Sequence, residues 1–135
     1  MASNGVTPDD LFDCADACLA VAIATQTYRH KNQANLPSKD VVDLAQFEAD
    51  LVSVSSTLRT VAVGVALAES KEAADALKDA TQRAKDAAKT IKNVKSAIAI
   101  AGTLLTVAAA AASQNPIALI SAAAELKKLV DAAVV

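Results

Sequence analysis

The stretch from residue 96 to residue 124 contains no charged side chain. In the segment before it, residues 71–95, a charged residue occurs at least every fourth position. A soluble chain removes such a run from water by burying it in a core, and a membrane protein does so by placing it among lipid tails. The run therefore restricts the chain to two plans. Either it forms a buried helical hairpin inside a bundle, or it forms a hairpin made for a membrane.

The composition of this run favours burial in a protein core. Pro116 divides it into an arm of about 17 residues and a shorter arm, whereas a spanning helix needs about 20 mostly apolar residues. The strongly apolar residues of the first arm contribute only about −2 kcal/mol of transfer free energy in total. Alanine adds little to that figure, but it lets helix axes approach toward the lower end of the roughly 8–10 Å range. We therefore expect a central hairpin that is buried on nearly all sides.

The bulky apolar residues of the hairpin are the candidates for a contact surface. If the segment 96–135 were released from the bundle, a partner protein or a membrane would meet them. The candidate partner or membrane face consists of Leu104, Leu105, Val107, Ile117, Leu119 and Ile120.

The overall composition predicts an all-α fold. About a quarter of the positions are alanine, the strongest helix former, while aromatic residues make up 2%. Three glycines and three prolines leave few places for the many turns of a β-rich fold. Residues 1–70 are net acidic and residues 71–135 are net basic, so the two halves attract. We expect one domain, residues 1–135, that forms an antiparallel alanine-rich helical bundle of four or five helices.

Local signals place the ends of the first two helices. Thr7 is suited to cap a helix and Pro8 to occupy its first turn, so the first helix should run from Pro8 to Asn32. Asparagines, a proline and a serine in residues 32–38 predict a loop, and Ser38 caps the next helix. That helix carries an apolar seam, a series that steps by three and four residues and marks one helix face. Its members are Leu44, Phe47, Leu51, Val54, Leu58, Val61, Val65 and Ala68.

A second seam, out of phase with the first, predicts a third helix over residues 71–112. The phase change indicates either a chain reversal with Ser70 as cap or one very long helix with a stutter, and we favour the reversal. Gly102 is a candidate kink that folds the last part of this helix back over the bundle. Asn115 and Pro116 then open the fourth helix. The members of the second seam are Ala73, Leu77, Ala80, Ala84, Ala87, Ile91, Val94, Ile98, Ala101, Leu105, Ala108 and Ala112.

The sequence offers no constellation of catalytic groups. A single histidine, His30, excludes the paired Glu-x-x-His sites of di-iron bundles and the usual histidine-rich zinc sites. No glycine-rich nucleotide loop and no G-x-S-x-G pattern occurs. We therefore expect a protein that is not an enzyme, with no catalytic, cofactor or metal site and no identified small-molecule substrate.

Cys14 and Cys18 lie four residues apart on the first expected helix. Their side chains share a face, but a helical backbone rarely permits the geometry of a disulfide between such residues. We expect reduced thiols that pack in the core as small hydrophobes. A metal or redox pair is the alternative, although the C-x-x-x-C spacing differs from the C-x-x-C of such sites.

Two charge stripes complete the sequence pattern. Asp9, Asp13 and Asp16 follow one face of the first helix, and lysines recur every seven residues from residue 71. Interleaved aspartates and the lack of nearby aromatic residues argue against nucleic-acid binding. Either the lysines form a solvated face or the two stripes match each other. The candidate electrostatic stripe consists of Lys78, Lys85, Lys89 and Lys92.

These observations predict a protein that acts by helix-face contacts with itself or with another protein. The N-terminal residues lack a secretory signal, so we expect a cytoplasmic location, with export by a signal-less route as the alternative. The plan of residues 71–135, amphipathic helices followed by an apolar hairpin, resembles that of the α-helical pore-forming toxins, whose hairpin is released on membrane contact. That resemblance implies the alternative function, a membrane-active protein that releases residues 96–135.

Overall fold

The computed structural model describes residues 5–64, 67 and 69–134, with side chains as far as residue 132. Within these residues the chain is all-helical and contains no strand, which confirms the predicted class. A short 3-10 helix, Gln33–Asn35, joins the first two α-helices. The five α-helices are α1 (Pro8–Asn32), α2 (Ser38–Gly64), α3 (Lys71–Ala88), α4 (Val94–Ala112) and α5 (Pro116–Val134).

Side-chain caps explain where the helices begin. The Thr7 hydroxyl accepts from the Asp10 N–H at 3.2 Å and the Asp10 carboxylate accepts from the Thr7 N–H at 2.9 Å, so the two residues close a capping box on α1. Ser70 accepts from the Ala73 N–H at 3.1 Å and caps α3. The predicted helix start after Ser70 is therefore confirmed, and the alternative of one uninterrupted helix is wrong.

The expected third helix is two helices. α3 ends at Ala88, and the Asn93 side chain caps α4 by accepting from the Ser96 N–H at 2.8 Å. The predicted fold-back at Gly102 is wrong, because α4 continues through this residue and the chain turns at residues 89–93, directly after Ala88, instead. The physical reason is the strong N-cap preference of asparagine, which competes with helix continuation at residue 93.

The break between α3 and α4 also shifts the buried face of the hairpin. The seam predicted for α3 is buried at Leu77, Ala80 and Ala84. Because residues 89–93 are not helical, the three-and-four spacing of α3 does not continue into α4. In α4 the predicted members Ile98 and Leu105 are only half-buried. The predicted members Ala101 and Ala108 are buried as expected. The other buried residues of α4, which the predicted seam does not contain, are Ala97, Ile100, Leu104, Val107, Ala110 and Ala111.

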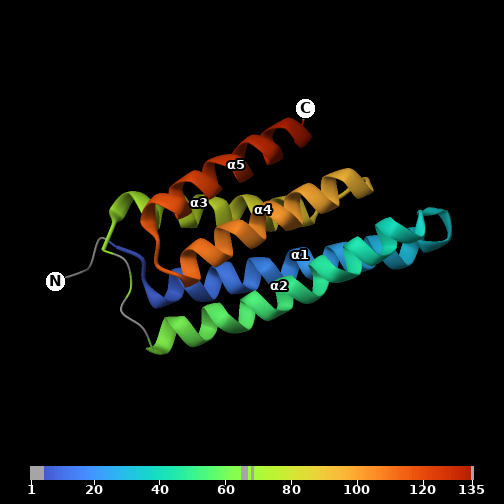
Figure 1. Ribbon diagram of the computed structural model, residues 1–135. Coiled ribbons are helices and arrows are strands. Elements are labelled where there is room, and N and C mark those ends of the chain that lie inside the picture. The colour runs from blue at the N-terminus through green and yellow to red at the C-terminus, as the bar shows by residue number, and fades with distance from the viewer. Residues whose placement is uncertain (1–4, 65–66, 68, 135) are drawn as a thin grey trace.

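The helices pack as a bundle in which α4 contacts each of the others. Figure 1 shows the chain running out along α1 and back along α2, with α3, α4 and α5 stacked against this pair. The closest pairs are α1 with α2 and α3, α4 with α2 and α5, and α3 with α5, so α4 lies between α2 and α5. At about 1.5 Å per residue, α1 and α2 reach roughly 40 Å and the other three less than about 30 Å. The loop end of the α1–α2 hairpin therefore extends past the rest of the bundle (Figure 1).

The core combines leucines with many alanines. Leu51, Leu58, Leu77, Leu104 and Leu126 have no exposed surface, and alanines from all five helices fill the space between them. Because alanine is small, these helices can approach closely and bury area over their length with few aromatic rings. In the seam predicted for α2, Leu44, Leu51 and Leu58 are buried, while Phe47, Val54 and Val61 are half-buried. Val65 and Ala68 lie outside the described residues.

Candidate functional site

The six residues of the candidate partner or membrane face do not share one exposed surface. Leu104, Val107 and Leu119 are buried in the core. Leu105 and Ile120 are half-buried and pack against it, whereas Ile117 at the start of α5 is 82% exposed. The leucines and the valine at the centre of the hairpin therefore belong to the packed interior of the bundle.

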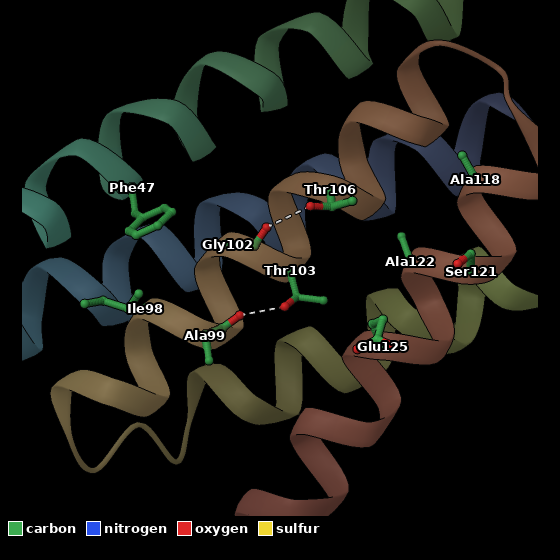
Figure 2. Close-up of a pocket in the computed structure, with 10 residues that line it drawn as sticks. All are labelled: Phe47, Ile98, Ala99, Gly102, Thr103, Thr106, Ala118, Ser121, Ala122 and Glu125. Carbon is green, nitrogen blue, oxygen red and sulfur yellow. Dashed lines mark hydrogen bonds between the residues drawn. The ribbon is translucent and has the colours of Figure 1, made fainter.

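α4 is not buried on all sides, in contrast to the expectation. Less than half of its apolar window, 44%, is buried, and an open groove of about 630 Å³ runs along its outer stripe. Figure 2 shows α4 between Phe47 of α2 on one side and α5 on the other. Small residues form most of the lining: Ala99, Gly102, Thr103, Thr106, Ala118, Ser121 and Ala122.

The two threonines of the groove present methyl groups rather than free hydroxyls. The Thr103 hydroxyl donates to the Ala99 carbonyl at 2.8 Å and the Thr106 hydroxyl donates to the Gly102 carbonyl at 3.2 Å (Figure 2). These bonds within α4 satisfy both donors, so the threonines expose their methyl groups. Glu125 is the one ionisable residue of the lining. The groove is therefore a mostly apolar, concave surface.

A second apolar surface lies between α1 and α2. None of its residues belongs to the candidate face predicted from the sequence. Ile23 is 62% exposed and Val52 is 52% exposed, and both line an open groove of about 480 Å³. We call this surface the α1–α2 face and define it as Leu19, Ala22, Ile23, Ala45, Ala49 and Val52. Val42, 65% exposed, extends the same stripe of α2 by three residues.

The charges around the α1–α2 face are paired within the chain. Arg29 donates to both carboxylate oxygens of Glu48, at 2.6 and 3.0 Å, and little of either side chain is exposed. The hydrogen bond that Arg29 donates to Glu48 raises the pKa of the Arg29 guanidinium, which stays charged at every practical pH. Farther along the hairpin, Arg59 donates to Asp16 at 2.5 Å. The face is thus apolar at its centre and electrically neutral at both ends.

The two cysteines lie side by side in the core. Cys14 and Cys18 are fully buried, as expected, and each is a free cysteine in the structure. The hydrogen bond with Cys14, together with burial, raises the pKa of the Cys18 thiol far above its ordinary value. A thiol held in its neutral form is a poor nucleophile and a poor metal ligand. Within the described residues, no group of three or more His, Cys, Asp or Glu side chains is placed to hold a metal ion.

The candidate lysine stripe is divided between two sites. Lys78 and Lys85 line a cleft with Asp10 and Asp13 of α1, and of the acidic stripe only Asp13 belongs to this lining. Asp16, the third member of the acidic stripe, pairs with Arg59 of α2 instead. Lys89 and Lys92 lie at the other end of α3, beside Lys31.

Comparison of the chain with protein-family models, with curated proteins and with solved structures finds no match. The function must therefore be argued from the surfaces themselves. The α1–α2 face has a sequence signal of its own, since Val42, Ala45, Ala49 and Val52 step by three, four and three residues. This series lies on α2 beside the buried series of Leu44, Leu51 and Leu58. In the structure Val42, Ala49 and Val52 are exposed, so no helix covers them.

Proposed function

We propose that the protein is a non-enzymatic, antiparallel, alanine-rich bundle that acts by helix-face contacts, and that its α1–α2 face pairs with the same face of a second copy. One observation carries this proposal. In the described part of the chain, the exposed large apolar side chains are Ile23, Val42, Val52, Val63 and Ile117, and the first three gather on one stretch of the α1–α2 hairpin. Apolar groups gathered on one surface mark an interaction site more often than scattered ones do.

The charge pattern favours a second copy over a charged partner. Arg29 with Glu48 and Arg59 with Asp16 neutralise the two ends of the face, so it offers no net charge to a nucleic acid or an anionic membrane. In such a dimer, the two-fold axis lies in the plane of the interface and runs across the hairpin, through the middle of the α1–α2 face. The Arg59–Asp16 end of one copy then lies opposite the Arg29–Glu48 end of the other. Asp16 and Arg59 keep about half of their side-chain surface exposed, so they are free to exchange hydrogen bonds across that interface.

The shape and size of the face are also suited to pairing with itself. The large Ile23 and Val52 stand beside the small Ala45 and Ala49, so each copy offers both ridges and hollows. Between its two ion-paired ends, from Asp16 to Arg29, the face is about 20 Å long, and two helices side by side are about 20 Å wide. Each chain therefore presents roughly 400 Å², which suits a weak, concentration-dependent dimer rather than a permanent one.

The test is the oligomeric state as a function of concentration. Sedimentation equilibrium of the full chain from about 1 to 500 µM should show a monomer–dimer equilibrium. The double variant Ile23→Asp with Val52→Asp should remain monomeric, because each dimer would bury four new carboxylates. The matched control is Ile117→Asp with Val63→Asp, which replaces two apolar residues that lie outside the α1–α2 face and are more exposed than Ile23 and Val52.

Circular dichroism of both double variants confirms that they remain helical before they are compared. Dimerisation of the control together with a monomeric face variant supports the proposal. A wild-type chain that stays monomeric across the whole range, or a face variant that dimerises as the wild type does, rules it out.

A second function, action on membranes, rests on α4. Val94–Ala112 is a 19-residue helix whose length and mean hydropathy of 1.7 are enough to cross a membrane, the one such helix in the described residues. Its outer stripe is also open to solvent along the groove of Figure 2. If α4 enters bilayers, Thr106→Lys should abolish leakage from anionic vesicles, since it places a charge near the middle of the span. Thr60→Lys on α2 is the matched control, and a wild type that causes no leakage rules this function out.

A further inference from the structure

One pocket of the bundle carries unbalanced positive charge. It has a volume of about 420 Å³ and lies where the end of α1 meets the end of α3 and the connection to α4. Lys31 comes from the last turn of α1, Lys89 follows α3, and Lys92 lies in the connection. We call this site the basic pocket and define it by these three lysines with Tyr28 and Ile91.

The basic pocket differs in charge from the other surfaces of the molecule. Its lining includes three lysines and no acidic residue, whereas Lys78 and Lys85 share their cleft with two aspartates. Among the described residues, the ion pairs involve Arg29, Arg59, Lys71 and Arg83, and none of the pocket lysines. These three cations are therefore available to a ligand.

The helix ends reduce this charge but do not cancel it. α1 and α3 both end at the pocket, and each C-terminus carries about half a negative charge. Three ammonium groups against these two ends leave roughly two positive charges. The five-residue connection produces this arrangement, because it turns the chain after Ala88 and brings Lys89 and Lys92 beside Lys31.

The rest of the lining selects the kind of anion. Tyr28 and Ile91 are half-buried, and Ala24 and Ala88 lie beside them, so one part of the pocket is apolar. The volume falls within the usual range for small-molecule sites. A phosphate monoester carries between 1.5 and 2 negative charges at pH 7, which matches the local excess of about two. An attached ring or alkyl group would be removed from water by the apolar part.

We propose that the basic pocket binds a small phosphate monoester, with the phosphate between Lys31, Lys89 and Lys92 and the attached group against Tyr28 and Ile91. Binding is non-covalent and involves no chemical step. It is independent of the α1–α2 face, which lies on the other side of α1 and shares no lining residue with the pocket. A free metabolite and a phosphate-bearing lipid headgroup offer the same chemistry.

The first measurement is a titration of the nitrogen-15-labelled full chain with phenyl phosphate, followed by amide chemical shifts. We expect saturable shifts that concentrate on residues 24–32 and 88–92 and weaken as salt is raised from about 20 to 300 mM. Inorganic phosphate should bind the same residues more weakly, and phenol should cause no saturable shift. Shifts spread evenly over the surface, or none that saturate below about 10 mM phenyl phosphate, would overturn the proposal.

Two double variants separate the pocket from general electrostatic attraction. Lys89→Gln with Lys92→Gln removes two of the three pocket cations and should weaken phenyl phosphate binding about tenfold or more. Lys78→Gln with Lys85→Gln changes the net charge equally on the same stripe and should leave the affinity within about twofold. Equal losses in the two variants would show that the pocket is not a site.

Vesicles identify the source of the phosphate. Flotation with vesicles that contain phosphatidic acid, compared with neutral phosphatidylcholine vesicles, tests the headgroup. Binding that the Lys89/Lys92 variant loses and the Lys78/Lys85 variant keeps assigns the pocket to a lipid phosphate. Saturable phenyl phosphate binding without flotation assigns it to a free ester. Flotation that both variants retain, without phenyl phosphate binding, contradicts the pocket.

Discussion

The adjacent residues Leu104 and Leu105 provide a direct test of how α4 packs. The apolar pattern of residues 71–112 as one helix predicts that Leu105 faces the core, but the structure buries Leu104 completely and leaves Leu105 half-buried. The two changes Leu104→Ala and Leu105→Ala remove the same atoms from the same helix. Helix propensity and the loss of side-chain entropy are therefore matched, and only the environment differs.

The expected losses follow from burial. Leu104 has no exposed surface and lies in the core cluster, so its truncation leaves a cavity and should cost about 3 kcal/mol or more. Leu105 packs against the core on one side only, and water fills the vacated space on the other, so about 1 kcal/mol is expected. Against a total stability of about 5–15 kcal/mol, the difference is large. It corresponds to a gap of roughly 5–10 °C in Tm for a chain of this size.

Urea denaturation followed by circular dichroism measures both losses in the same buffer. The slopes of the free energy against urea should agree between the variants, because the surface exposed on unfolding is nearly unchanged. Equal losses, or a greater loss for Leu105→Ala, would refute the packing of α4 and with it the break between α3 and α4.

Three further predictions concern backbone, capping and ionisation. Gly102→Ala should raise the free energy of unfolding by about 0.5–1 kcal/mol, because the new Cβ would meet Phe47 at an ordinary 3.6 Å and alanine favours the helix; a lower Tm would contradict this. Asn93→Ala should cost about 1 kcal/mol through the lost cap on Ser96, seen as a lower urea midpoint, with Asn35→Ala as the uncapped control. The raised pKa of Cys18 keeps its thiol protonated in the folded chain, while the unfolded thiol ionises near pH 8.5, so this contribution to stability is complete below that pH and is lost as pH rises. Between pH 9 and 10, Cys18→Ala should therefore reduce the fall in unfolding free energy by about 1.2 kcal/mol, and an unchanged slope would show that the thiol ionises in the folded state.

The sequence by itself determined the helical class and most helix ends. These features depend on local chemistry: alanine content, the Thr7 and Ser70 caps, and proline at the first position of α1 and α5. A cap acts on backbone groups within three residues, so its effect can be read without knowledge of the neighbouring helices. The core positions Leu44, Leu51 and Leu58 were predictable for the same reason, since one uninterrupted helix keeps its phase.

The break at residues 89–93 shows where the local information was insufficient. The apolar series Ala87, Ile91, Val94 and Ile98 continues past residue 93 without a missing member, so the pattern predicts one helix, whereas the Asn93 side chain caps a new helix in the structure. Helix continuation and capping differ by about 1 kcal/mol at such a position, so packing decides between them. Once α4 begins at Val94, its contacts with α2 and α5 select Leu104 rather than Leu105 for the core.

The surfaces were decided by tertiary structure alone. A side chain becomes part of a face only when the neighbouring helices leave it uncovered, and nothing in the sequence states that α2 covers one side of α1 and α3 another. Ile23 and Val52 are on different helices, and they form one apolar surface because α1 and α2 fold back on each other. The basic pocket likewise needs the chain turn after Ala88, which brings Lys89 and Lys92 to Lys31 across nearly 60 positions of sequence. The sequence determined which segments are helices, and their packing determined which faces remain for function.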